Sequence, residues 1–239
     1  KLEAVLTAKM SKFIFLPLMG IHSTAAVTHS LKHFYTGASN VQNFPEFVAV
    51  GLVDDVQIIY YDNNTKRCEP KQDWMKNNTD DKYWEEETQG LIGTQDNFKA
   101  NINIAKSRFN QTGGVHIFQR MYGCEWNDET EEVNVYDQFG YDGEDLLIWD
   151  GKQIRWISAK EQAEIMANKW NNGVELAVQN DHLVNTCPRW LKKYVDYGRS
   201  SLIRTDLPSV SFLQKSSSSP VSCHATGFYP NRAEMFWRK

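Results

Sequence analysis

Two neighbouring carboxylates and six dispersed histidines are the side chains of this chain most able to do acid–base or metal chemistry. Asp54 and Asp55 are adjacent beside a turn signal, and neighbouring strand residues point to opposite faces, so a solvated turn explains them better than a catalytic pair. His29 and His33 would share a strand face, but no cysteine or histidine pair at metal-ligand spacing accompanies them. We find no nucleophile with its base and no cofactor loop. The sequence therefore predicts a protein that is not an enzyme and that uses no cofactor or metal.

Four cysteines are the other reactive side chains, at Cys68, Cys124, Cys187 and Cys223. In an oxidising compartment some of them should form disulfides. Four cysteines permit three complete pairings, and their spacing in the sequence does not choose among these.

The N-terminal residues have the three-part layout of a secretory signal peptide. Lys12 precedes an apolar run at 13–21, and small residues follow at 23–26. We therefore expect residues 1–26 to be upstream residues and a signal peptide, so that the mature chain begins near Val27. Three N-x-Thr sequons, which a secreted chain could glycosylate, stand at Asn63, Asn77 and Asn110.

Composition and charge narrow the class of protein. Of the 239 residues, 41% are hydrophobic and 13% aromatic, which is enough for a substantial core. The 26 basic and 30 acidic side chains give a net charge of −4, which argues against a nucleic-acid partner. After the signal, no run approaches the roughly 18 apolar residues that a membrane-spanning helix needs.

The elements that would position these side chains occur as strands followed by a helix, twice over. Residues 29–58 predict two or three antiparallel strands, and periodic spacing over about 80–109 predicts a long helix that Gly113 and Gly114 end. Four short strand-like segments follow at 115–158. The duplication predicts antiparallel strands, shared in one sheet, with helices on one face.

A second helix should follow these strands. Ser158 could cap its start, and the Asn172-Gly173 pair should kink it. Its groove-type positions, by helical spacing, would be Met166, Lys169, Trp170, Glu175, Gln179, His182, Thr186, Trp190 and Tyr194.

Beyond Pro208 the composition changes again. The segments VSCHATGFYP and MFW predict two strands of an immunoglobulin-type sandwich, to which Cys223 and Trp237 would belong. Because two strands cannot bury a sandwich core, we expect the natural product to continue past Lys239, with a partner for Cys223 and a membrane anchor.

Ten motifs, in order, carry a resemblance to a known family: HSLKHFYTG, AVGLVDD, KYWEEET, RFNQT, QRMYGCEW, YDGED, NKW, WLKKYVDYG, RTDLPSV and CHATGFYP. With them, residues 27–239 resemble the heavy chain of MHC class I molecules, in a form like that of bony fish. The resemblance implies an α+β fold in which an eight-stranded antiparallel sheet carries two long helices, followed by a truncated immunoglobulin-like domain. It implies an alpha-1 half at 27–114, an alpha-2 half at 115–206 and an incomplete alpha-3 domain at 207–239.

The same resemblance implies which residues bind a peptide between the two helices. Tyr83, Trp190 and Tyr194 would hold its ammonium end, and Lys169 and Trp170 its carboxylate end. The full implied set is His33, Tyr35, Tyr83, Asn101, Arg108, Arg120, Tyr122, Lys169, Trp170, His182, Trp190 and Tyr194. The family's pattern has tyrosines at His33, Arg108 and His182 and a hydroxyl residue at Met166, so these positions depart from it.

Further contacts follow from the family. The underside of the sheet would bind β2-microglobulin through Phe34, Thr36, Gln119, Met121, Gly143 and Asp145. The resemblance also pairs Cys124 with Cys187 and makes Asn110 the glycan position.

The function that the resemblance implies is to bind short peptides and display them to T-cell or other immune receptors, along the secretory pathway to the cell surface. The alternative is a nonclassical molecule with a non-peptide ligand or none, which serves as an interaction surface; His33, His182 and Met166 favour it. At an unperturbed pKa of about 6.5, both histidines would protonate in acidic endosomes and loosen the peptide's ammonium end.

Overall fold

One antiparallel sheet joins the two halves of the chain. The computed structural model describes residues 27–229 and 235–236, so the expected signal segment lies outside the described residues. The strand order is β4-β3-β2-β1-β5-β6-β7-β8. The bounds are β1 Thr28–Ser39, β2 Phe47–Val53, β3 Val56–Asp62, β4 Glu69–Pro70, β5 His116–Asn127, β6 Val133–Tyr141, β7 Glu144–Asp150 and β8 Arg155–Ser158. The sheet is shared by the two halves, as predicted.

Residue alternation determines the two faces of this sheet. In β2 every second side chain is buried, from Phe47 to Val53, which is the pattern of a strand with one face in the core. β1 pairs with β5 along its whole length, from Thr28 opposite Asn127 to Ser39 opposite His116. This central pair fixes which residues of the two halves meet.

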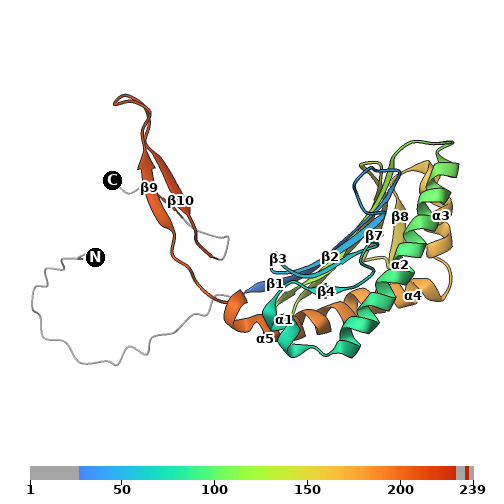
Figure 1. Cartoon of the computed structure of the whole chain (residues 1–239), viewed down its shortest axis with the longest axis horizontal. Coiled ribbons are helices and arrows are strands. Elements are labelled where there is room, and N and C mark those ends of the chain that lie inside the picture. Colours follow the sequence, from blue (N-terminus) through green and yellow to red (C-terminus); the bar gives the residue numbers. More distant parts are fainter. Residues whose placement is uncertain (1–26, 230–234, 237–239) are drawn as a thin grey trace, which may run out of the picture.

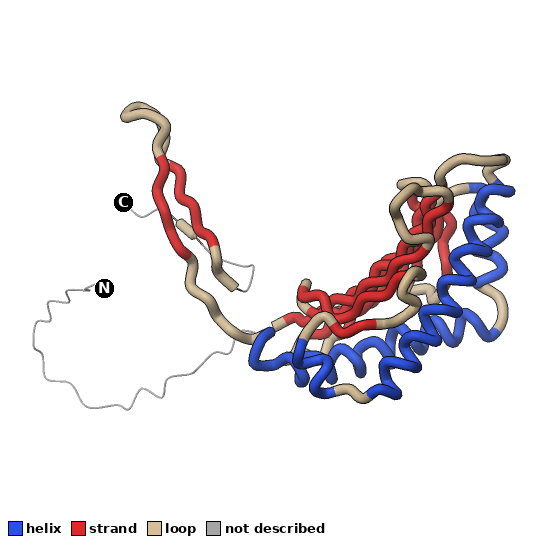
Figure 2. Tube along the Cα trace, viewed as in Figure 1, coloured by secondary structure: helices blue, strands red, loops and turns tan. Residues whose placement is uncertain are grey.

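All the helices of the platform lie on one face of the sheet, as Figure 1 and Figure 2 show. The first half supplies α1 Asp73–Asn78 and α2 Asp81–Arg108, within one residue of the predicted helix. The side chain of Asp80 caps α2 by accepting the Tyr83 N–H at 2.8 Å.

The second helical region is divided into several parts. These are a 3₁₀ turn at Glu161–Ala163, α3 Glu164–Trp170, α4 Val174–Asp181, a π-helical turn at His182–Thr186 and α5 Cys187–Leu202. The expected cap by Ser158 is wrong, because Ser158 pairs with Leu147 as the last residue of β8. Gly173, at φ 94°, separates α3 from α4, so the Asn172-Gly173 pair breaks the helix more strongly than the predicted kink. Pro188 lacks the N–H that would continue an α-helical ladder, which accounts for the irregular turn before it.

The core lies between the sheet and the helices. Its fully buried side chains include Phe47, Phe118, Leu183 and Leu191. The disulfide between Cys124 and Cys187 ties β5 to α5, in agreement with the pairing that the resemblance implied. None of the helices within residues 27–229 is long and apolar enough to cross a membrane.

A separate two-stranded sheet follows the platform, formed by β9 Ser209–Leu213 and β10 Ser222–Thr226. It fits the start of an immunoglobulin-like domain, as expected. The prediction that MFW forms a strand is wrong for Met235 and Phe236, which are not in a strand, and Trp237 lies outside the described part. β10 pairs with β9, the segment before the serine run, in a register that sets Cys223 opposite Phe212.

Candidate ligand-binding groove

We take as the candidate groove the surface of β1, β5 and β6 that lies between α2 on one side and α3 to α5 on the other (Figure 1). His33 and Tyr35 of β1 face the helices. The ring centroid of Tyr35 lies 6.1 Å from that of Phe98 on α2. His33 stacks on Tyr122 of β5, with ring centroids 4.7 Å apart. Strand alternation sends Phe34 to the opposite face. The predicted orientation of β1 is therefore confirmed.

One end of the groove holds three aromatic side chains that join its two walls. The hydroxyls of Tyr83, on α2, and Tyr194, on α5, are 2.7 Å apart. Trp190 stacks on Tyr194 at 5.4 Å and lies 5.7 Å from Tyr83. Burial raises the pKa of both tyrosines, so their hydroxyls stay neutral and can donate or accept hydrogen bonds.

A second cluster lies beside it on the floor. Tyr35 and Tyr122 share a hydrogen bond of 2.7 Å, and the ring of His182 lies 5.7 Å from Tyr122. Nδ1 of His33 is buried without a hydrogen-bond partner within the described residues. Burial, then His182 and Arg120, lower the pKa of His33 to about 3, and burial also lowers that of His182. The expectation that His33 becomes a cation in acidic endosomes is therefore wrong, because desolvation opposes its protonation, and so do the charge on Arg120 and any charge that His182 would acquire.

The same shift predicts an acid-sensitive stability. A histidine whose folded pKa is below its unfolded value near 6.5 contributes stability above pH 6.5 that is lost as the pH falls toward 3. Between about pH 7.4 and 5.5, the wild type should lose about 1 kcal/mol more free energy of unfolding than His33→Tyr. Urea unfolding at both pH values measures this. His182→Tyr isolates the facing histidine, and equal losses in the wild type and His33→Tyr would refute the role of His33.

A charged bridge crosses the middle of the floor. Arg120 of β5 donates from Nε and Nη2 to the two carboxylate oxygens of Asp137 on β6, at 2.9 and 2.5 Å. Gln179 of α4 accepts from Arg120 at 3.2 Å and donates to Asp137 at 2.8 Å. Burial alone would lower the pKa of Arg120, but Asp137 outweighs it and the net pKa is raised, so the guanidinium stays charged. The charges of Arg120 and Asp137 therefore neutralise each other, and the hydrogen bonds of Gln179 link α4 to the floor.

The remaining predicted peptide-binding residues lie toward the other end. Trp170, at the end of α3, packs 5.0 Å from Phe139 and 5.4 Å from Trp156. Lys169 and Arg108 are exposed and Asn101 is half-buried. Within residues 27–229, no hydrogen bond or ion pair links these three to the clusters above. Met166 is 7% exposed and belongs to the core under α3.

The comparisons with known proteins decide the family. A family model described as Class I Histocompatibility antigen, domains alpha 1 and 2, matches residues 27–202. The chain belongs to the MHC class I family. It is 35% identical over 234 residues to major histocompatibility complex class I-related protein 1 of Mus musculus, covering 95% of this chain and 68% of the relative. It is 34% identical over 222 residues to the H-2 class I histocompatibility antigen, K-K alpha chain, of Mus musculus, covering 90% and 60%. The chain thus spans 60 to 68% of the length of these relatives.

The underside of this class I platform carries a shallow depression of about 280 Å³ on the face opposite the helices. All six residues predicted to contact a light chain line it: Phe34, Thr36, Gln119, Met121, Gly143 and Asp145. Phe34 and Met121 are partly exposed there, and Gln119 and Asp145 are exposed. Strand alternation brings Phe34 and Thr36 of β1 and Gln119 and Met121 of β5 to one surface.

Other predicted positions lie outside the class I groove. Asn110 is exposed in the turn after α2, at φ 53°, whereas the Asn63 amide accepts a hydrogen bond from the Phe47 N–H at 3.1 Å. Cys68 is 1% exposed, and burial raises the pKa of its thiol to about 12, so it is an unreactive filler.

Sequence reasoning missed two contacts of the second helical region. Helical spacing marked Gln179 as a groove position but did not reveal its bridge to Arg120 and Asp137. Asn171 carried no signal, although its side chain bonds to the backbone of β8. Both contacts join residues far apart in the sequence, so no local pattern contains them.

Proposed function

We propose that this chain is an antigen-presenting class I heavy chain that binds short peptides between its two helices. The observation that carries the proposal is the Tyr83–Tyr194 hydroxyl pair under Trp190, which spans the groove at one end. Neutral hydroxyls of this kind suit a peptide ammonium, which needs hydrogen-bond acceptors when it leaves water. Lys169 is exposed and forms no ion pair with the other described residues, which supports a role at the peptide carboxylate.

We propose β2-microglobulin as the partner under the sheet. The partly exposed Phe34 and Met121, beside the polar Gln119 and Asp145, support this, because an apolar centre with a polar rim is typical of protein interfaces. The domain division at 27–114, 115–206 and 207–239 belongs to the same proposal.

The remaining parts of the proposal concern location and partners. The Cys124–Cys187 disulfide supports folding in the secretory pathway, from which the chain would reach the cell surface for T-cell or other immune receptors. Asn110, exposed in a turn, is the proposed glycan site. We propose that the chain is not an enzyme. In support, the tyrosine hydroxyls of the groove hydrogen-bond to one another, and no nucleophile is paired with a base among the described side chains.

A second candidate function is to hold a small ligand or none. The middle of the floor is covered by the chain's own side chains: Asp137 is 1%, Phe139 6% and Tyr122 7% exposed. Gln179 closes over the Arg120–Asp137 pair from above. This favours a ligand confined to one half of the groove.

The test is to express the chain with β2-microglobulin, purify the complex and identify what acid elutes by mass spectrometry. We expect a mixture of short peptides of restricted length. Asp145→Lys, which reverses the charge of this exposed side chain on the underside, should reduce recovery of the complex about tenfold, whereas Asp96→Lys, the same change at an exposed position of α2, should not. A single small compound, or nothing, eluting from an intact complex would support the second function and refute peptide presentation.

A further inference from the structure

The break between α3 and α4 is hydrogen-bonded to the edge of the sheet through the side chain of Asn171. Asn171 follows the last residue of α3 and keeps helical backbone angles, with its N–H bonded to the Ala167 carbonyl at 2.9 Å. Two residues later, Gly173 turns the chain out of the helix. The α4 that follows has no buried residue. Apolar packing of α4 is limited to partly buried residues such as Leu176, so polar contacts contribute to holding this stretch on the sheet.

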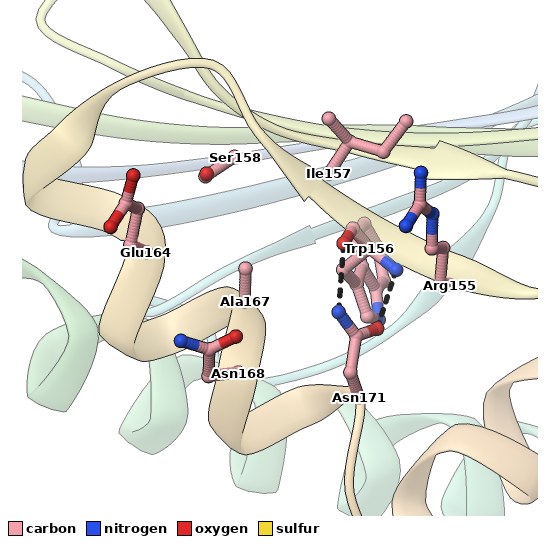
Figure 3. Close-up of a pocket in the computed structure, with 8 residues that line it drawn as sticks. All are labelled: Arg155, Trp156, Ile157, Ser158, Glu164, Ala167, Asn168 and Asn171. Carbon is pink, nitrogen blue, oxygen red and sulfur yellow. Dashed lines mark hydrogen bonds between the residues drawn. The ribbon is translucent and has the colours of Figure 1, made fainter.

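The contact is a reciprocal pair of hydrogen bonds to the edge strand. The Trp156 N–H donates to Oδ1 of Asn171 at 2.6 Å, and Nδ2 of Asn171 donates to the Trp156 carbonyl at 2.8 Å. Figure 3 shows both bonds, with Asn171 reaching from the end of its helix to the strand. β8 is the last strand of the sheet, so these groups of Trp156 point away from β7. The carboxamide takes the place that a further strand would occupy.

The side chain of Trp156 is held by the residue before Asn171. Trp156 is 4% exposed and packs 5.4 Å from Trp170, which in turn packs against Phe139 of the floor. Trp170 thus packs against the ring of Trp156, and Asn171 hydrogen-bonds to the backbone of the same strand residue. The two contacts together define where the end of α3, with Lys169 and Trp170, stands over the groove.

We infer that Asn171 is a positioning residue that locks the α3–α4 break to β8 and so places Lys169 and Trp170 for a ligand carboxylate. This inference rests on the proposed function. The amide suits the task because it donates and accepts at once. An aspartate would keep the acceptor for the Trp156 N–H but oppose the Trp156 carbonyl, and an alanine would leave both edge groups without this partner.

The test compares Asn171→Ala with Asn168→Ala, whose side chain lines the same cavity of about 310 Å³ but makes no hydrogen bond with the other described residues. Each chain is assembled with β2-microglobulin, and its affinity is measured for a peptide with a free C-terminal carboxylate and for the same peptide amidated. Asn171→Ala should reduce the preference for the free acid about tenfold, and Asn168→Ala should leave it unchanged. Hydrogen exchange over residues 155–158 should quicken in Asn171→Ala alone.

Each result decides a separate point. Quicker exchange with an unchanged acid-to-amide ratio would overturn the positioning role. If the wild type binds neither peptide, the proposed function fails. Unchanged hydrogen exchange at 155–158 in Asn171→Ala would overturn the inferred role of Asn171 in holding the α3–α4 break to β8. Should Asn171→Ala fail to assemble, the isosteric Asn171→Asp, which keeps the acceptor for the Trp156 N–H but sets a carboxylate oxygen against the Trp156 carbonyl, should show the same two losses.

Discussion

Asp137→Ala should destabilise the platform by about 3 kcal/mol, because it leaves the guanidinium of Arg120 without its counter-ion inside the floor. Asp137 is 1% exposed, and Arg120 is held between the rings of Tyr122 and Phe139 at 4.2 and 5.1 Å. These rings do not replace a carboxylate that accepts two hydrogen bonds from the fork. Urea unfolding followed by tryptophan fluorescence measures the change.

Two further variants isolate the unpaired charge as the cause. The double variant Arg120→Met with Asp137→Leu removes both charges and keeps the volume, so its stability should return to within about 1 kcal/mol of the wild type. Asp145→Ala removes an exposed carboxylate from the opposite face and should change stability by less than about 0.5 kcal/mol. A double variant as unstable as Asp137→Ala would show that the loss comes from packing instead.

Replacing both Cys124 and Cys187 by alanine should cost on the order of 4 kcal/mol, the largest effect that we expect from any pair of changes. The disulfide links residues 63 apart in sequence, and without it the unfolded chain regains the entropy of that open loop. It is also one of the ties between α5 and the floor. The melting temperature and urea midpoint of the two chains measure the loss.

The free cysteines provide the control for this experiment. Cys68→Ala removes a buried thiol that closes no loop, so it should cost no more than about 1 kcal/mol. Thiol titration of the denatured, unreduced wild type should find only Cys68 and Cys223 reactive. Reaction of all four cysteines, or equal stability of the disulfide-free chain, would contradict the prediction.

Sequence patterns predicted the elements of this protein because their causes are local. The bounds of α2 follow from three- and four-residue spacing and from Asp80 at its start, and the faces of β1 follow from alternation. These rules act over a few residues, and in α2 and β1 the tertiary arrangement agrees with them. The resemblance, carried by its motifs, added the fold, the disulfide and the family, and the comparisons agree with it.

Only the tertiary structure decided how those elements meet, and with it the chemistry of the groove. The acidity of His33 depends on burial against Tyr122 and on His182, which arrives from a helix about 150 positions away in the chain, so an unperturbed pKa near 6.5 was the wrong expectation. Ser158 has a side chain that often caps helices, but here it pairs with Leu147 of β7 and is the last residue of a strand. Gln179 and Asn171 were unremarkable polar residues until the fold brought a buried ion pair to one and an edge strand to the other. Burial and long-range pairing belong to the packed molecule as a whole, and for that reason no window of its sequence contains them.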